Sequence, residues 1–207
     1  KEEYACDEAL TVKPCLPEVL VKPGSPEEAA KILRLANEKR VPVTPRGGGT
    51  GLCGGCVAVS GGILLSLERM NRILEIDEEN YVAVVEAGVV LANLYKAVEA
   101  RGFYYPIYPG EESATVGGNV ATNAGGMKAV KYGVTRHYVL GLEAVLPNGE
   151  IIQTGGKYVK VSTGYDLTQL LVGSEGTLAV VTKVILKLLP RPKATTTLFV
   201  PFKDLND

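Results

Sequence analysis

Hydrophobic positions in the first part of the chain switch between strand-like and helix-like spacing. The apolar run from Glu18 to Val21 predicts a strand, and Ser25 to Glu28 then has the form of a capping box with proline in the first turn. Apolar residues recur at helical spacing from Ala29 to about Lys39, and Val41 to Thr44 follows as a short strand. This order predicts one βαβ unit.

The later pattern predicts helices and strands in irregular order, without an internal repeat. Polar turns at 77–80 and 147–149 separate strands, and the stretch 106–126 is rich in proline and glycine. The class implied is α+β. The strands expected are Ile63 to Leu65, Val82 to Val85, Val139 to Leu146, Ile151 to Gln153, Leu178 to Leu188 and Thr197 to Val200, and the helices are Leu91 to Val98, ended by Gly102, and a short one from Asp166.

Composition and charge narrow the functional classes. The 207 residues are 46% hydrophobic and 22% charged, and 22 Lys and Arg against 23 Asp and Glu give a formal net charge of −1. Without a basic surplus, nucleic acid is not an expected partner. Apolar runs such as 177–190 contain lysines and are shorter than the roughly 20 residues of a membrane span. The sequence therefore predicts no transmembrane segment. Its first residues show no secretory signal, so a cytoplasmic location is expected.

Glycine is unusually frequent and clustered. The chain has 24 glycines, whereas ordinary usage of about 7% would give about 14. Eight fall between Gly47 and Gly62, six between Gly110 and Gly133, and a third group ends at Gly173 and Gly176. Such runs let backbone N–H groups converge on an anion, or let a flat ligand lie on the main chain. Three such segments favour one large phosphate-containing ligand over ordinary turns.

Two common nucleotide-binding motifs do not fit these glycines. Gly49 to Gly54 has the G-x-G-x-x-G pattern, but only eight residues separate it from the strand at Ile63, too few for the helix of a Rossmann unit. Gly125 to Lys128 lacks the spacing and the hydroxyl of a P-loop. What remains is a strand that runs into Pro45 to Leu52, where N–H donors could surround a pyrophosphate and Arg46 could add positive charge.

Three motifs, in order, resemble the FAD-binding domain of the vanillyl-alcohol oxidase and p-cresol methylhydroxylase superfamily. They are Pro45 to Leu52, Thr115 to Gly126 and Gly173 to Leu178. The segments 132–136, 140–143 and 164–167 resemble its D-2-hydroxy acid branch, the D-lactate dehydrogenases and the flavoprotein subunit of glycolate oxidase. The resemblance covers about Leu16 to Pro190. It implies a single FAD-binding domain over 1–207 with two lobes, about 1–90 and 91–207, that hold a small parallel sheet and a larger mixed or antiparallel sheet with flanking helices.

The resemblance also implies which residues bind FAD. Residues 46–52 would surround the pyrophosphate through main-chain amides. Pro109, Gly110, Ser113 and 115–119 would follow the ribityl chain and isoalloxazine, and Asn123, Gly125 and Gly126 would complete that wall. Glu175, Gly176 and Val180 would lie by the adenosine half. No histidine in the first glycine loop could tether the flavin, so noncovalent FAD is expected. The candidate cofactor residues are Pro45, Arg46, Gly47, Gly48, Gly49, Thr50, Gly51, Leu52, Pro109, Gly110, Ser113, Thr115, Gly117, Gly118, Asn119, Asn123, Gly125, Gly126, Glu175, Gly176 and Val180.

The reaction that the resemblance implies is oxidation of a D-2-hydroxy acid, of the lactate or glycolate class, by hydride transfer to FAD. The sequence shows one histidine, His137, no metal-ligand cluster and no catalytic constellation. The substrate groups are therefore expected in a further domain after Asp207, and this chain alone is expected to be inactive on substrate. An electron-acceptor protein or subunit is a further expected partner.

Two alternatives stay open. A stand-alone flavin-binding electron-transfer subunit would obtain its substrate site from a partner chain and would use Cys53 and Cys56, which stand where the family more often has serine and alanine. Otherwise these cysteines are free thiols that pack as small hydrophobes. An NADPH-dependent reductase of the same fold, such as the enolpyruvyl-sugar reductases, would reduce its flavin with a nicotinamide, although the D-2-hydroxy acid-like segments argue against it.

Overall fold

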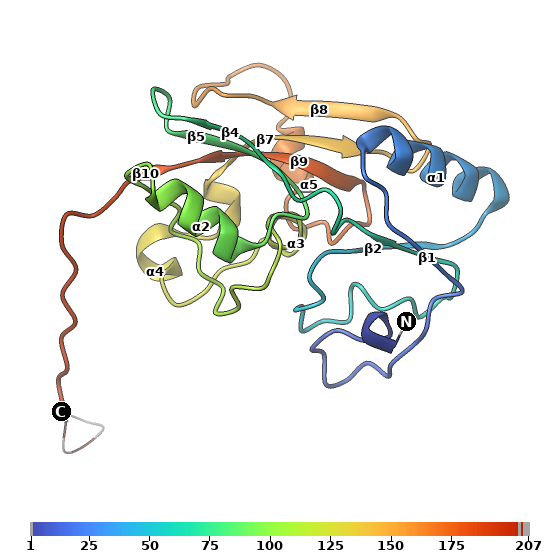
Figure 1. Cartoon of the computed structure of the whole chain (residues 1–207), viewed down its shortest axis with the longest axis horizontal. Helices are drawn as coiled ribbons and strands as arrows, with labels where there is room; N and C mark the ends of the chain where they lie inside the picture. Colours follow the sequence, from blue (N-terminus) through green and yellow to red (C-terminus); the bar gives the residue numbers. More distant parts are fainter. Residues whose placement is uncertain (1, 203, 205–207) are drawn as a thin grey trace.

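A computed structural model describes residues 2–202 and 204 of the chain. Its strands form a three-stranded parallel sheet and a five-stranded antiparallel sheet, with helices around them (Figure 1). A short antiparallel pair, β6 (Phe103–Tyr104) and β10 (Leu189–Pro190), lies beside them. The arrangement confirms the expected α+β class with a small parallel sheet and a larger antiparallel one.

The small sheet has the strand order β1-β3-β2, formed by Val19–Val21, Ile63–Ser66 and Val43–Arg46. Helix α1 (Pro26–Lys39) connects β1 to β2, and the Ser25 side chain caps it by accepting a hydrogen bond from the backbone N–H of Glu28. The predicted βαβ unit therefore forms, with β3 lying between its two strands. β2 begins at Val43 rather than at Val41, since Pro42 has no N–H to donate to a ladder.

The large sheet has the strand order β4-β5-β9-β7-β8, with β9 (Val180–Lys187) at its centre. The other strands are β4 (Ile73–Asp77), β5 (Val82–Glu86), β7 (Val139–Val145) and β8 (Ile151–Gly155). The sequence pattern predicts all of these except β4, in which no residue is fully buried. Because β4 and β5 belong to this sheet, the chain passes from one sheet to the other between Ser66 and Ile73, not near residue 90.

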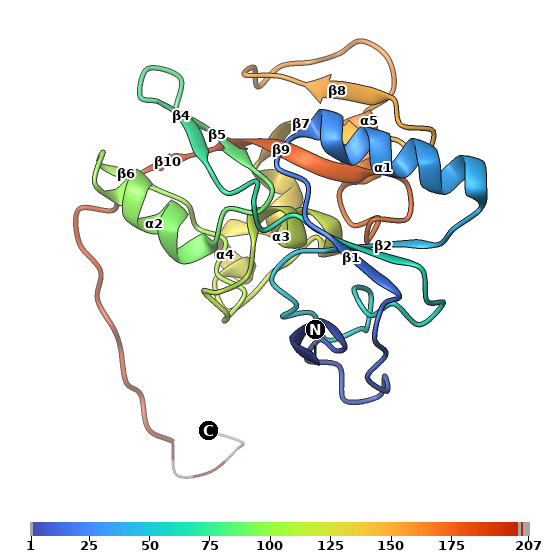
Figure 2. The ribbon, with the colours of Figure 1, turned by 45° about the vertical axis from the view of Figure 1, so that its right-hand side comes forward.

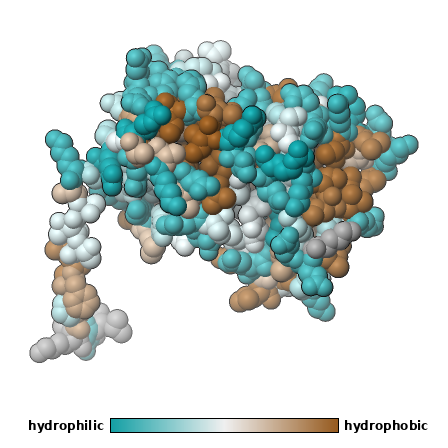
Figure 3. All heavy atoms as spheres, viewed as in Figure 1, coloured by the Kyte–Doolittle hydropathy of each residue, from teal (hydrophilic) through white to brown (hydrophobic). Residues whose placement is uncertain are grey.

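The prediction of a strand at Thr197 to Val200 is wrong. Residues 191–202 contain no helix or strand, their side chains are exposed, and the segment extends away from the body in both ribbon views (Figures 1 and 2). Among the described residues no strand lies beside it, so its β-branched and aromatic side chains have no sheet to pack on. In Figure 3 the same segment is the projecting arm, with apolar side chains on its surface.

A helix forms inside the stretch where the sequence predicts only loops. α3 (Val116–Thr122) begins at Thr115, whose hydroxyl accepts the N–H of Gly118, and ends at Asn123 in the left-handed conformation. Its two glycines and its β-branched residues give it low intrinsic helix propensity. The helix forms because both ends are capped and because it packs against β5 and β9.

The remaining elements surround this framework, and one buried cluster joins α1, α2 and α3 to both sheets. α1 and α5 pack against β7 and β8, α3 packs against β5 and β9, and β2 packs against β3, so the end of β2, α3 and the start of β9 are held around the candidate site. Among the described residues, no helix is long and apolar enough to cross a membrane. These further elements are α2 (Leu91–Glu99), α4 (Ala129–Tyr132), α5 (Leu167–Leu171, capped by Asp166) and 3₁₀ turns at Glu2–Tyr4 and Thr135–His137.

Candidate functional site

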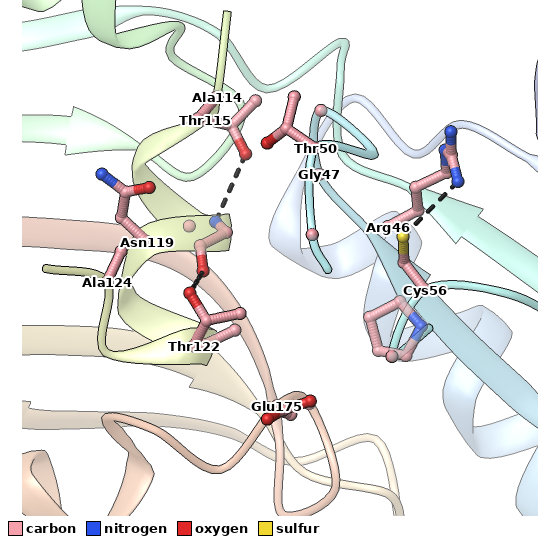
Figure 4. Close-up of a pocket in the computed structure, with 18 of the residues that line it drawn as sticks. Arg46, Gly47, Thr50, Cys56, Ala114, Thr115, Asn119, Thr122, Ala124 and Glu175 are labelled. Carbon is pink, nitrogen blue, oxygen red and sulfur yellow. Dashed lines mark hydrogen bonds between the residues drawn. The ribbon is translucent and has the colours of Figure 1, made fainter. Parts of the chain in front are cut away.

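The three glycine-rich segments meet around one cavity of about 340 Å³. Figure 4 shows the first glycine loop and α3 on opposite sides of it, with Glu175 from the third segment between them. Ligand pockets commonly span about 300–1,000 Å³. The predicted cofactor residues in the wall are Pro45, Arg46, Gly47, Gly48, Gly49, Thr50, Gly51, Leu52, Pro109, Thr115, Gly117, Gly118, Asn119, Glu175, Gly176 and Val180.

The first glycine loop follows β2 and lies directly against the chain in front of α3. A Cβ at Gly47 would overlap the Thr115 hydroxyl, and a Cβ at Gly48 would lie 3.0 Å from the Ser113 carbonyl oxygen. Gly49 has a φ of 76°, a left-handed conformation. Glycine is therefore needed for these two segments to pack together, and from Gly47 to Gly49 the loop presents main chain to the cavity.

Helix α3 contributes Gly117, Gly118 and Asn119 to the opposite wall. A Cβ at Gly117 would lie 2.6 Å from Ala87 Cβ and 2.9 Å from the Ala87 carbonyl oxygen, so the helix sits tightly on the chain after β5. Asn119 is 3% exposed, and its Nδ2 has no hydrogen-bond partner among the described residues. Leaving such a buried donor unpaired costs about 1–3 kcal/mol, so this amide marks a place for an acceptor from a ligand.

The third segment connects the other two. The backbone N–H of Glu175 donates to the Ala121 carbonyl oxygen at 2.8 Å and fastens this segment to α3. Its carboxylate lies over the continuation of the first loop, since a Cβ at Gly55 would be 2.9 Å from Glu175 Oε2. Gly176 has a φ of 75°, and a Cβ there would lie 2.9 Å from Pro45 Cγ. The three segments are thus in direct contact and form one site.

Arg46 is 7% exposed and joins the cavity wall to the N-terminal segment 2–16. Its Nη1 donates to the Cys6 carbonyl oxygen at 2.9 Å and to Cys56 Sγ at 3.4 Å, and its Nη2 donates to the Glu3 carbonyl oxygen at 3.0 Å. These bonds use most of the donors of the guanidinium fork. The contribution of Arg46 to a pyrophosphate site stays a prediction, whereas its role in holding the N-terminal segment against the first loop is direct.

Replacing Arg46 by lysine is expected to release this segment. A lysine ammonium cannot reproduce the planar fork, so the Glu3 and Cys6 carbonyls lose their donor. We expect the free energy of unfolding to fall by about 2 kcal/mol and proteolysis within 2–16 to accelerate, as measured by urea denaturation and limited digestion. Arg101→Lys, at an exposed residue paired with Glu78, is the matched control. Equal protease resistance of the two variants would contradict the anchoring role.

Cys56 lies in the cavity wall beside Arg46, and the pKa of its thiol is raised. Burial raises the pKa of its thiol, the Arg46 guanidinium opposes this rise, and the Asp7 carboxylate adds to it. The thiol donates to Asp7 Oδ2 at 3.8 Å. The surroundings of Cys56 therefore disfavour its thiolate form.

Five predicted cofactor residues lie outside the cavity wall. Asn123 ends α3, and its Oδ1 accepts the backbone N–H of Arg136 at 3.0 Å. Gly126 has a φ of 152° and packs against the Tyr108 carbonyl. Such residues position the wall rather than form it, and their contact with a cofactor stays a prediction. The five are Gly110, Ser113, Asn123, Gly125 and Gly126.

The wall also contains residues that the sequence reasoning missed. The alanines among them lie inside or next to the glycine-rich motifs, or directly after β5. A small side chain at such a place could have been taken as a sign of a cavity wall. Asp7 has no such signal, because it precedes the start of the resemblance at Leu16. The missed residues are Asp7, Cys53, Gly55, Cys56, Leu67, Ala87, Glu111, Ala114, Ala121, Thr122, Ala124, Ser174, Ala179 and Val181.

Comparison with known proteins identifies the family of the chain. The sequence matches the FAD binding domain family over residues 17–155. It is 58% identical over 205 residues to an uncharacterized FAD-linked oxidoreductase of Mycobacterium tuberculosis, a match that covers 99% of this chain and 45% of that protein. It is 49% identical to a D-lactate dehydrogenase of Anaerostipes hadrus, covering 100% of this chain and 43% of the relative. It is 48% identical to the glycolate oxidase subunit GlcD of Bacillus subtilis, covering 92% and 41%.

A solved structure shares the fold. Alkyldihydroxyacetonephosphate synthase superposes with a TM-score of 0.74 at 27% sequence identity, over 84% of this chain and 32% of the synthase chain. The chain spans less than half the length of the curated relatives it matches. The likeness therefore concerns only the part of those proteins that aligns with this chain.

Proposed function

Because the chain belongs to the FAD binding domain family, we propose that it is the cofactor-binding part of an oxidoreductase that oxidises a D-2-hydroxy acid. FAD is the cofactor that the family match gives. The lactate or glycolate class of substrate is supported by the relatives named D-lactate dehydrogenase and glycolate oxidase subunit. These names also favour hydroxy acid oxidation over the NADPH-dependent alternative.

The cavity has features that fit FAD. Three segments bring main chain rather than side chains to its walls, as close contact with a flat ligand and a pyrophosphate requires. The unpaired Nδ2 of Asn119 carries the proposal, because a flavin ring edge supplies the nitrogen and oxygen acceptors that this buried donor lacks.

Each wall has a proposed task. The main chain of the first glycine loop would bind the pyrophosphate, α3 would hold and orient the flavin half through Asn119, and Glu175 with Gly176 would lie by the adenosine half. When bound, FAD supplies the capacity to accept a hydride. The residues of this chain bind it noncovalently, fix its orientation and exclude water.

Oxidation of a hydroxy acid also requires groups that recognise its carboxylate and remove its hydroxyl proton. His137 is committed elsewhere, since its Nδ1 accepts the backbone N–H of Val134 at 3.1 Å and it lies outside the wall. We assign carboxylate recognition and removal of the hydroxyl proton to the remainder of a longer protein of the relatives' kind. An electron-acceptor partner and a cytoplasmic location remain predictions; the relative GlcD is itself named as a subunit.

The first test is a visible absorption spectrum of the purified chain after addition and removal of excess FAD. We expect flavin bands to stay with the protein and to pass into the supernatant on acid precipitation. Flavin in the pellet would contradict noncovalent binding, and no retained flavin would contradict the site. A second test supplies D-lactate or glycolate and a dye acceptor to the longer protein, and we expect the dye to be reduced. Bleaching of the flavin by NADPH alone would instead support the reductase alternative.

A further inference from the structure

We infer that Cys53 and Cys56 are a redox-active pair whose reversible disulfide controls how firmly the cofactor cavity holds FAD. They form the motif Cys53-Gly54-Gly55-Cys56, both line the cavity, and both are free in the structure. The proposed function uses neither thiol. The inference that the disulfide forms does not depend on the proposed function, whereas the inference that it changes FAD binding does.

The two thiols have different surroundings that suit different steps. Cys53 is exposed, so an oxidant from solution reaches it first. Cys56 is half-buried, and its Sγ contacts both the Arg46 guanidinium at 3.4 Å and the Asp7 carboxylate at 3.8 Å. An accessible thiol next to a protected second thiol is the usual arrangement of an attacking and a resolving cysteine.

The two residues between the cysteines allow a small ring to close. A disulfide requires the two Cβ atoms to approach to about 3.5–4.5 Å. Gly54 has a φ of 77°, which only glycine adopts easily, and neither Gly54 nor Gly55 has a side chain to resist rearrangement.

Ring closure would change the contacts that keep the cavity wall in place. Gly54 lies against the Val12 side chain of the N-terminal segment, and Gly55 lies under the Glu175 carboxylate. Moving Cys56 Sγ toward Cys53 removes it from Arg46, the residue that holds the Glu3 and Cys6 carbonyls. Oxidation therefore removes one contact of Arg46 and shifts the loop that lies against Val12 and Glu175, so it disturbs the cavity wall where the N-terminal and third segments border it.

The chemistry is thiol–disulfide exchange with a small-molecule disulfide RS–SR. The Cys53 thiolate attacks one sulfur of RS–SR, which forms Cys53–S–SR and releases one thiolate RS⁻. The released RS⁻ takes up the proton of the Cys56 thiol and becomes RSH. The Cys56 thiolate then attacks the Cys53 sulfur, which forms the protein disulfide and releases the second RS⁻, and this thiolate takes up from solvent the proton that Cys53 had given up. Two protein thiols are oxidised and RS–SR is reduced to two thiols, so atoms and electrons balance.

The test equilibrates the reduced protein with mixtures of reduced and oxidised glutathione, blocks free thiols and maps disulfides by peptide mass spectrometry. We expect the Cys53–Cys56 disulfide to dominate, FAD to bind about tenfold more weakly after oxidation, and proteolysis within 2–16 to accelerate. Reduction by dithiothreitol should restore both properties. The double variant C6S/C15S should keep the whole response, whereas Cys53→Ser should lose it.

Several outcomes would overturn the inference. A Cys6–Cys56 disulfide, or a glutathione adduct on Cys53 that never resolves, would show that the motif is not the redox pair. Equal FAD affinity in the reduced and oxidised states would remove redox control while leaving the proposed function intact. Absence of FAD binding in both states would instead contradict the proposed function, and the peptide map would still report on the disulfide.

Discussion

Replacing Gly117 by alanine is expected to destabilise the fold by about 3 kcal/mol and to weaken FAD binding more than tenfold. The new Cβ would lie 2.6 Å from Ala87 Cβ and 2.9 Å from the Ala87 carbonyl oxygen. Ala87 cannot withdraw, because its own N–H donates to the Thr182 carbonyl in β9 and its carbonyl accepts the N–H of Gly117. α3 must move away and take Asn119 with it. Urea denaturation and flavin fluorescence titration measure the two effects.

Gly118→Ala is the matched control in the same helix. A Cβ at Gly118 would meet only the Thr115 hydroxyl, at 3.1 Å, and alanine raises helix propensity by about 1 kcal/mol over glycine. We expect the stability of this variant to stay within about 1 kcal/mol of the wild type. Similar destabilisation by both substitutions would show that contact with Ala87 is not the reason for glycine at 117.

Replacing Asn119 by leucine is expected to separate stability from binding. The protein without cofactor should be as stable as the wild type or more stable, because a buried amide donor without a partner gives way to an apolar group of similar size. FAD affinity should fall by about 10–100-fold, the equivalent of one lost hydrogen bond of about 1–3 kcal/mol. Thermal unfolding without FAD and fluorescence titration with FAD provide the two measurements.

An exposed asparagine provides the comparison. Asn93→Leu on α2 should change neither the unfolding temperature nor FAD affinity, because its side chain is exposed and lies outside the cavity wall. Unchanged FAD affinity in N119L, or a marked loss of stability without cofactor, would mean that the Asn119 amide has a structural rather than a binding role.

The sequence predicts the elements whose signals are local. α1 is bounded as expected because Ser25, Pro26 and the apolar periodicity all specify the same helix. The first glycine loop and Glu175 are found because their motifs are contiguous, and the cavity wall contains them.

What the sequence could not predict depends on distant partners. α3 has poor helix propensity and forms through its caps and through packing on β5 and β9. β4 has no fully buried residue and is a strand because β5 pairs with it. Asp7 joins the cavity wall because two distant residues hold its neighbours, Arg46 the carbonyl of Cys6 and Gly51 the N–H of Glu8. The strand expected at Thr197 to Val200 does not form for the converse reason. Its composition suits a strand, but in the part of the chain that the structure describes no strand lies beside it.

The central place of β9 in the large sheet has a consequence for how the chain is made. β5 and β7 are joined only through β9, which is the last of the five strands to be synthesised. Until Lys187 has left the ribosome, both strands have one unpaired edge, and open edges of apolar strands promote association between chains. A nascent chain that ends before β9 therefore exposes two strand edges that β9 covers in the folded protein.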